Sequence, residues 1–284
     1  MDRVGVVGCG LMGSGIAEVC ARAGLEVVVR EVDDTALALG RQRIERSFAR
    51  AVAAGKLSEE DRTAAVESVA FTTSLEDLGD CELVVEAVVE HEATKLAIFA
   101  ALDKAVQRPD AVLASNTSSI PIMKLAMATS RPEQVVGIHF FNPVPVLRLV
   151  ELVTSLLTSE ATEQAARSFV TGRLNKRVIA SKDRAGFVVN ALLIPYILSA
   201  VRMLESGFAT AEDIDTGMVE GCAHPMGPLA LADLIGLDTT QAVALSLYEE
   251  FKEPLYAAPP LLSRMVEAGL LGRKTGQGFY PYHR

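Results

Sequence analysis

Cysteine is scarce in this sequence, and basic residues are outnumbered by acidic ones. The 284 residues include four cysteines, and no two of them form a Cys-x-x-Cys pair, so neither a disulfide framework nor a thiolate zinc site is indicated. The 27 lysines and arginines against 36 aspartates and glutamates give a net charge of −9. We therefore expect no broad binding of nucleic acid or of an anionic membrane, and an anionic ligand needs a local basic patch.

Metal-ligand patterns, targeting segments and long apolar runs are also missing. His91, His224 and His283 are isolated, and no histidine pair has the helical spacing of metal ligands, so we expect no metal site. The chain passes from Met1 straight into a strand-like run, which leaves no room for a signal peptide. The most apolar stretch, 187–201, is shorter than the ~20 residues of a membrane-spanning helix. We expect it to be a buried helix in a cytoplasmic protein.

Apolar β-branched runs alternate with helical patterns through the first two-thirds of the chain. The strand-like runs are 4–7, 26–29, 83–88, 111–114 and 135–140. The helical patterns between them are 14–23, 34–54, 93–106 and 121–128. Because continuously apolar strands are typical of sheets covered on both faces, the alternation predicts an α/β fold with a doubly wound, Rossmann-type parallel sheet.

The strand pattern stops after about residue 186, and the apolar stretches that follow have helical spacing. A smaller, all-helical domain is therefore expected at the C-terminal end. We place the boundary at the charged turn 183–186, which gives domains 1–185 and 186–284. The apolar positions of the second domain form either its own core or a surface covered by a partner chain.

Three glycines lie between the first strand-like run and the first helical pattern. Gly8, Gly10 and Gly13 have the G-x-G-x-x-G spacing, which allows a tight turn, close approach of a pyrophosphate and close helix packing. Glycines also mark ordinary turns, but this position before a helix N-terminus favours phosphate binding. We predict a dinucleotide site that includes Leu11 and Met12, the two residues between Gly10 and Gly13.

An acidic residue follows the second strand-like run. Glu31 comes 23 residues after Gly8, where a carboxylate would hydrogen-bond the adenosine ribose. Because that carboxylate repels a 2′-phosphate, NAD is favoured over NADP. Arg30 beside it favours the alternative, NADP, since an arginine there can accommodate the 2′-phosphate.

A histidine stands at the end of an apolar strand and is followed by a proline-rich turn. His139 lies near the end of 135–140, and the chain returns as 147–153. If the turn 142–145 reverses the chain, Glu151 comes close to His139, where it would orient the imidazole and favour its protonated form. His139 would then be a general base for a hydroxyl proton. The alternative is a buried histidine that forms its hydrogen bonds within the core and has no catalytic role.

Small hydrogen-bonding side chains follow another strand, in the run 115–119. Ligands bind at the carboxyl ends of strands in open parallel sheets, so these side chains are candidates for a binding site. Ser119 could instead supply a helix N-cap before Pro121, and both interpretations can hold together.

These motifs together resemble one enzyme family across nearly the whole chain. They are the glycine segment 8–13, Glu-Ala-Val-Val-Glu at 86–90, Ser-Asn-Thr-Ser-Ser at 115–119, His-Phe-Phe-Asn-Pro-Val-Pro at 139–145, Leu-Val-Glu at 149–151, Gly-Phe-Val-Val-Asn at 186–190, His-Pro-Met-Gly-Pro at 224–228 and Lys-Thr-Gly-Gln-Gly-Phe-Tyr at 274–280. The sequence resembles the 3-hydroxyacyl-CoA dehydrogenase family and is most similar to its short bacterial members, the 3-hydroxybutyryl-CoA dehydrogenases. It departs from the family pattern at Ala185, where a proline is expected.

The resemblance implies an NAD-dependent oxidoreductase that interconverts a short-chain (S)-3-hydroxyacyl-CoA, such as 3-hydroxybutyryl-CoA, and a 3-oxoacyl-CoA, such as acetoacetyl-CoA. It implies that His139 removes the proton of the 3-hydroxyl group and that Glu151 is its partner. Ser118, Asn142 and Asn190 would hold the substrate oxygens and the nicotinamide region. For Asn190 the alternative is that it fixes a packing register or caps a carbonyl group.

The resemblance also implies further contacts to the two coenzymes. Glu90, Lys95, Asn142 and Lys274 match family contacts to NAD, and Ser47 matches a contact to CoA. Basic residues are concentrated in the same region as Ser47, namely Arg41, Arg43, Arg46, Arg50 and Lys56, against the single acidic Glu45. We expect Arg50 and Lys56 to bind CoA, although a solvated helix face is the alternative.

Family members are typically dimers through the C-terminal domain, so the resemblance implies a homodimer. Two other functions remain open. One is a dehydrogenase of the same fold that acts on a free hydroxy acid or sugar acid. The other is a non-catalytic NAD-binding protein.

Overall fold

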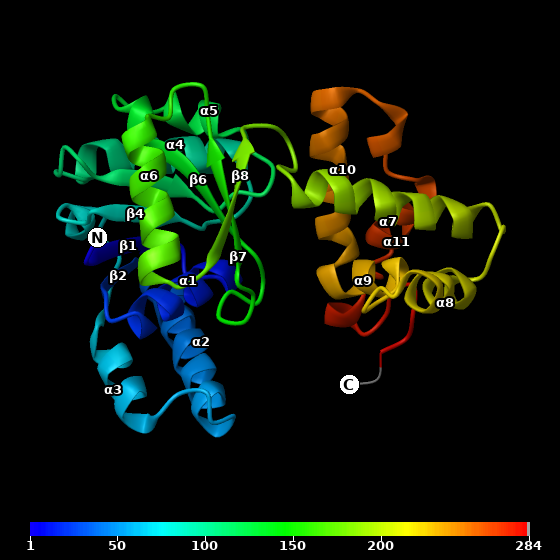
Figure 1. Cartoon of the computed structure of the whole chain (residues 1–284), viewed down its shortest axis with the longest axis horizontal. Helices are drawn as coiled ribbons and strands as arrows, with labels where there is room; N and C mark the ends of the chain where they lie inside the picture. The colour runs from blue at the N-terminus through cyan, green and yellow to red at the C-terminus, as the bar shows by residue number, and fades with distance from the viewer. Residues whose placement is uncertain (283–284) are drawn as a thin grey trace. The chain divides into compact units, whose positions relative to one another are not determined.

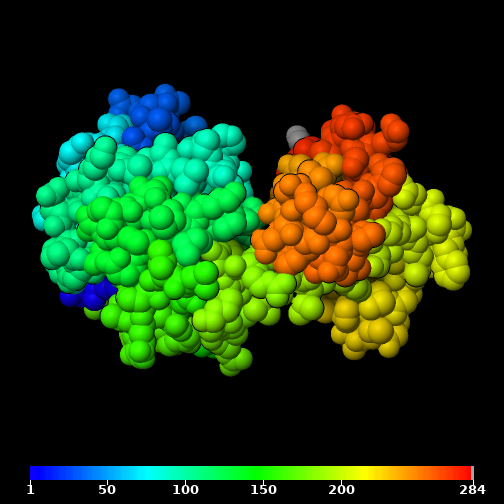
Figure 2. Space-filling view, turned by 90° about the horizontal axis from the view of Figure 1, so that it is seen from above, coloured from blue at the N-terminus to red at the C-terminus, as the bar shows by residue number. Residues whose placement is uncertain are grey.

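The computed structural model describes residues 1–282, so His283 lies outside the described residues. The chain divides into two compact units, Met1–Arg184 and a second unit that begins at Ala185. The first unit is built on a sheet, and the second is built of helices (Figure 1). In the space-filling view, the first unit carries the blue-to-green part of the chain and the second carries the yellow-to-red part (Figure 2).

Eight strands form one sheet in the order β3-β2-β1-β4-β5-β6-β7-β8. Their bounds are Arg3–Val7 (β1), Glu26–Arg30 (β2), Val69–Thr72 (β3), Leu83–Glu86 (β4), Val112–Ser115 (β5), Val135–Phe140 (β6), Leu149–Thr154 (β7) and Arg177–Lys182 (β8). Neighbouring strands from β3 to β6 are parallel, β7 is antiparallel to β6, and β8 is parallel to β7. The predicted doubly wound sheet is confirmed, and the predicted reversal after His139 makes β7 antiparallel to β6 within this mostly parallel sheet. The segment 141–148 is shorter than the dozen or more residues of a parallel crossover, so β7 runs back beside β6.

Helices cover both faces of this sheet. Their bounds are Leu11–Arg22 (α1), Asp34–Ala53 (α2), Glu59–Glu67 (α3), Glu92–Ala105 (α4), Ile122–Ala126 (α5) and Glu160–Ser168 (α6), with short turns at Glu76–Leu78 (η1), Pro132–Gln134 (η2) and Phe169–Arg173 (η3). Side-chain oxygens cap several N-termini, as where Asp33 accepts a hydrogen bond from the amide of Ala36 at the start of α2. α1 begins at Leu11, three residues earlier than the sequence pattern predicts.

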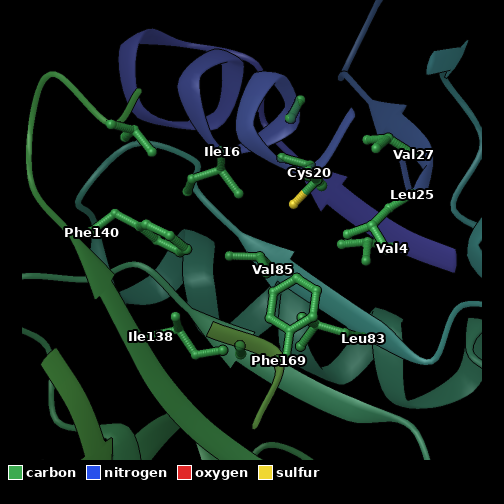
Figure 3. Packing of buried hydrophobic residues seen from close by; sticks show 14 of the residues in the cluster. Val4, Ile16, Cys20, Leu25, Val27, Leu83, Val85, Ile138, Phe140 and Phe169 are labelled. Atoms are coloured by element: carbon green, nitrogen blue, oxygen red, sulfur yellow. The ribbon is translucent and has the colours of Figure 1, made fainter. Parts of the chain in front are cut away.

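The core on one face lies between β1, β4 and β6 and the helices α1 and α6. Ile16 and Cys20 of α1 point toward the strands, and Phe169 covers Leu83 from the other end (Figure 3). Ile44 and Phe48, one turn apart on α2, extend this core. The opposite face is covered by α4 and α5. This two-sided burial explains why the central strands are uniformly apolar.

The second unit has a core of its own. Its helices are Val189–Glu205 (α7), Ala211–Cys222 (α8), Pro228–Ile235 (α9), Leu237–Phe251 (α10) and Pro260–Glu267 (α11), with short turns at Pro254–Tyr256 (η4) and Arg273–Thr275 (η5). Ile197, Leu198 and Val201 of α7 are fully buried within it. Leu192 on the same helix is 74% exposed. Some of the apolar residues of α7 are therefore buried in the unit's own core, and others are exposed at its surface.

Within residues 1–282, no single helix has the length and apolarity to cross a membrane, and only the pair α9 and α10, bent by 98°, passes that test by length and composition.

Candidate active site

The glycine segment makes a turn that leaves room in front of it. Gly8 has φ +88°, a left-handed conformation that favours glycine, and a Cβ on Gly13 would lie 1.8 Å from the Gly8 carbonyl oxygen. At Gly10 no atom lies within 4 Å of an added Cβ, so the space beside this residue is open. No side chain caps the N-terminus of α1. The turn, the open space and the uncapped helix end fit the pyrophosphate of a dinucleotide.

Glu31 is tied to this turn, and Arg30 is directed elsewhere. The Glu31 carboxylate accepts hydrogen bonds from the backbone amides of Cys9 and Val32. Arg30 donates from Nε to the carbonyl oxygen of Thr73 at 3.2 Å. The arginine that contacts the glycine turn is Arg43 of α2, whose Nη1 donates a hydrogen bond to the carbonyl oxygen of Cys9 at 3.3 Å. The Glu31 carboxylate is therefore held at the glycine turn, and Arg30 is bonded to the segment after β3.

A buried ion pair lies at the carboxyl end of β4. Glu86 is 0% exposed, and its Oε1 lies 2.6 Å from Nζ of Lys95, which is 1% exposed. The same carboxylate accepts from Ser115 Oγ at 2.6 Å and from the Val88 amide at 2.7 Å. Lys95 Nζ also lies 3.3 Å from Oε2 of Glu90. Lys95 thus connects the buried Glu86 to the partly exposed Glu90.

Glu90 connects that ion pair to the polar run after β5. Its Oε1 accepts from Thr117 Oγ1, from the Ser118 amide at 2.9 Å and from Ser119 Oγ at 3.0 Å. Burial by itself raises the pKa of Glu90, but the Lys95 ammonium and these donors outweigh it, so the pKa lies below its ordinary value. Glu90, Lys95 and Ser118, predicted separately, belong to one network.

The turn after β6 does reverse the chain, and it brings His139 and Glu151 together. The two residues are directly opposite in the antiparallel ladder of β6 and β7. His139 Nδ1 lies 2.7 Å from Glu151 Oε2, with Glu151 fully buried and His139 7% exposed. This contact orients the imidazole, as a general base requires.

The polar run after β5 and the segment after β6 are joined by Asn116. Its Oδ1 accepts a hydrogen bond from the amide of Phe140 at 2.9 Å. Asn142 lies two residues further along and is exposed. The glycine turn, the Glu90 network and the His139–Glu151 pair therefore lie along the carboxyl ends of β1, β4, β5 and β6, where ligands bind in such sheets.

One of the two interpretations of the run 115–119 is not observed. Ser119 does not cap α5, because its hydroxyl is bonded to Glu90. Asp183 takes that place and accepts from the amides of Ile122 and Met123 at 2.8 and 2.7 Å. A carboxylate far along the chain can do this because β8 ends beside the start of α5.

The residues expected to bind CoA lie on and after α2. Ser47 is partly exposed, and Arg50 and Lys56 are exposed. Within residues 1–282, no acidic side chain forms an ion pair with Arg50 or Lys56. This part of the surface therefore keeps uncompensated positive charge on an acidic protein.

Two family models cover almost all of the chain. The NAD-binding domain of 3-hydroxyacyl-CoA dehydrogenase matches residues 3–184, and the C-terminal domain of 3-hydroxyacyl-CoA dehydrogenase matches residues 186–282. The chain belongs to the 3-hydroxyacyl-CoA dehydrogenase family. The resemblance seen in the sequence is thereby confirmed.

Individual members of the family are similar over their full length. A 3-hydroxybutyryl-CoA dehydrogenase of Mycobacterium tuberculosis is 60% identical over 282 residues, which is 99% of each chain. The crystal structure of M. tuberculosis FadB2 has a TM-score of 0.99, covering 100% of this chain and 99% of that one at 60% identity. The crystal structure of (S)-3-hydroxybutyryl-CoA dehydrogenase PaaH1 from Ralstonia eutropha has a TM-score of 0.94 at 46% identity, covering 100% of both chains.

Two predicted site residues of this family member belong to the second unit. Asn190 is the second residue of α7 and is partly buried. Lys274 is exposed, and its Nζ lies 2.5 and 2.6 Å from the two carboxylate oxygens of Asp238, on the first turn of α10. Burial raises the pKa of Asp238, but its bond to Lys274 and the amide of Thr239 outweigh this and lower it.

The sequence reasoning missed two polar residues that build the site. Glu86 and Asn116 both lie inside motifs that carried the family resemblance, but neither was singled out. For Glu86 a signal was present, because a charged residue in the otherwise apolar run 83–89 is rarely buried without a partner. For Asn116, the bond to Phe140 depends on the neighbouring strand and gives no local signal.

Proposed function

We propose that this protein is an NAD-dependent dehydrogenase that interconverts a short-chain (S)-3-hydroxyacyl-CoA, such as 3-hydroxybutyryl-CoA, and the corresponding 3-oxoacyl-CoA. The observation that carries the proposal is the buried His139–Glu151 pair at 2.7 Å, placed on the same sheet edge as the glycine turn. The 60% identity to a 3-hydroxybutyryl-CoA dehydrogenase supports the choice of substrate.

His139 acts as the base in this proposal. Because Nδ1 is bonded to Glu151, Nε2 is the nitrogen that takes the proton of the 3-hydroxyl group during oxidation and returns it during reduction. The buried Glu151 carboxylate stabilises the imidazolium that forms. NAD, when bound, accepts the hydride from C3. A positioned base of this kind is commonly worth about 10²–10⁴ in rate.

Other residues position the two coenzymes and the substrate. Ser118 lies in the run fixed by Glu90, so its hydroxyl is held near the end of β5. Asn142, in the segment after β6, steadies the charge that develops on the substrate oxygen, with Asn190 of the second unit in the same role. Glu90 and Lys95 contact NAD, and Lys274 is a further contact.

We propose NAD rather than NADP as the coenzyme. Glu31 lies at the glycine turn, where a carboxylate accepts from a ribose hydroxyl and repels a 2′-phosphate. Arg30, which could have neutralised that phosphate, donates to Thr73 instead. The CoA part of the substrate is held by Ser47, Arg50 and Lys56.

The test is oxidation of NADH and of NADPH by the purified protein with acetoacetyl-CoA, free acetoacetate and a long-chain 3-oxoacyl-CoA. Fast turnover with acetoacetyl-CoA and NADH, but not with free acetoacetate, is the expected result. Turnover of free acetoacetate at a comparable rate would favour a dehydrogenase of free acids. NADH binding without turnover of any of the three would favour a non-catalytic protein.

We also propose a homodimer formed through the second unit. The support is the apolar surface of that unit, where Leu192 is 74% and Phe208 is 80% exposed. Light scattering after size exclusion measures the mass, and about twice the 30.3 kDa of the chain is expected. A mass equal to one chain contradicts the proposal.

A further inference from the structure

A basic hollow lies on the first unit outside the site described above. It has a volume of about 390 Å³, and its charged lining residues are Arg22, Arg148, Arg173 and Lys176, with no acidic side chain among them. Arg22 is the last residue of α1, and Arg148 precedes β7. Arg173 is the last residue of η3, and Lys176 directly precedes β8. Both α1 and the segment between β6 and β7 contribute lining residues to it. Neither the glycine turn nor the His139–Glu151 pair lines it.

The positive charge of the hollow is only partly compensated by its surroundings. Arg22 pairs with Glu18 at 3.5 Å, and Arg173 pairs with Asp2 at 2.6 Å. Arg148 forms no ion pair or side-chain hydrogen bond with any residue in 1–282. Two carboxylates therefore face four cations, which leaves two positive charges over.

Lys176 is the buried member of this group. It is 9% exposed, and its Nζ donates to the carbonyl oxygens of Val144 and Leu147 at 2.6 and 2.7 Å. Burial lowers the pKa of Lys176, and the nearby guanidinium groups of Arg22 and Arg148 lower it further. The cations are thus close enough to repel one another, and an anion between them would relieve that repulsion.

We propose that this hollow binds a phosphate group. A phosphate carries close to the two negative charges that are missing, and guanidinium groups hold its oxygens by paired hydrogen bonds. The volume exceeds what a bare phosphate needs, and Val19, Ala23 and Pro145 supply apolar wall for the remainder of an organic phosphate. The ligand is therefore either free phosphate or a small phosphomonoester.

The hollow also borders the segment after β6. Lys176 holds two carbonyl oxygens of this segment, and Asn142 lies two residues before Val144. The hollow and the segment that carries Asn142 therefore share Lys176 as a contact.

The experiment measures phosphate binding to the full chain by calorimetry, with saturating NADH present so that the glycine turn is occupied. Inorganic phosphate and glycerol 3-phosphate are the probes, and potassium chloride at equal ionic strength is the blank. The variants are Arg148→Met and Arg22→Met. The matched control is Arg177→Met, which removes the same charge from an exposed neighbour that does not line the hollow.

The expected result is that the wild type and Arg177→Met bind phosphate equally, and that Kd rises about tenfold in each of the other two variants. Glycerol 3-phosphate that binds more tightly than phosphate supports an organic ligand, and equal affinities support free phosphate. Equal weakening in all three variants indicates diffuse charge attraction and overturns the proposal. An unchanged Kd in Arg148→Met overturns it as well. Because no acyl-CoA is used, the outcome is independent of the proposed catalytic function.

Discussion

The buried Glu86–Lys95 pair makes a quantitative prediction for the variant Glu86→Gln. A glutamine has the same shape as the glutamate. Its amide oxygen can still accept hydrogen bonds from Lys95 and from the Val88 amide. Its amide nitrogen takes the place of the carboxylate oxygen that now lies 2.6 Å from the Ser115 hydroxyl. What it loses is the negative charge beside a lysine that is 1% exposed. Removing one partner of a buried pair costs about 3–5 kcal/mol.

The expected loss lies at the lower end of that range, because Lys95 keeps a second carboxylate. Glu90 Oε2 lies 3.3 Å from its ammonium and remains charged. We therefore expect the free energy of unfolding to fall by about 3 kcal/mol. The control is Glu92→Gln, which removes a carboxylate that is 46% exposed and pairs with Lys124 at the surface, and whose cost should stay below about 1 kcal/mol.

The assay is urea unfolding at neutral pH, followed by circular dichroism, with the double variant Glu86→Gln/Lys95→Met included. Replacing the lysine as well removes the buried ammonium that has lost one of its two carboxylates, so the double variant should recover at least half of the loss. If Glu86→Gln costs no more than Glu92→Gln, the reasoning is wrong, and the pair is not a buried charge that stabilises the fold.

Three further predictions concern the site itself. His139→Gln should lower turnover by about two decades or more while the affinity for NADH hardly changes, and near-normal turnover would remove His139 from its role. Glu31→Ala should relax the preference for NADH over NADPH, measured as a ratio of kcat/KM, whereas Arg30→Met should leave the ratio unchanged; a shift with Arg30→Met would contradict the geometry. The pKa of Glu90 is lower in the folded state than its ordinary value of 4.5. The charged carboxylate therefore stabilises the fold fully at a pH above 4.5, and this stabilisation is lost as the pH falls through the lower, folded-state pKa. Unfolding measured from about pH 7 to pH 3 should therefore show wild type and Glu90→Gln converging on the acid side, and a constant difference would refute the assignment.

The repeating apolar pattern accounts for the part of the fold that the sequence predicts. The central strands β1, β4 and β6 are buried on both faces, so their apolar runs stand out. β3 and β8 were missed, since they lie at the two edges of the sheet and are partly exposed. An edge strand such as Arg177–Lys182 mixes charged and apolar residues, and nothing local distinguishes it from a loop.

The candidate site divides in a similar way. The glycine turn is local, so spacing alone predicted its conformation, and the observed φ at Gly8 agrees with it. The contacts of Asn116 and Asp183 join segments 24 and 61 residues apart, and such contacts depend on which strands become neighbours. Residue spacing carries no information about that order, which is why the sequence offered Ser119 as an alternative cap and gave no sign of Asp183.

The His139–Glu151 pair is the exception, a contact between separate strands that the sequence did predict. It was predictable because the chain between the strands is too short for a crossover, so the second strand has to run antiparallel. In an antiparallel ladder, side chains alternate between faces with a period of two. A register shifted by one residue would place Val150 or Leu152 opposite His139 and would move the carboxylate to the other face. The length of the segment 141–148 therefore determines which residue becomes the partner of the base, and this segment is as much a part of the catalytic arrangement as the two side chains.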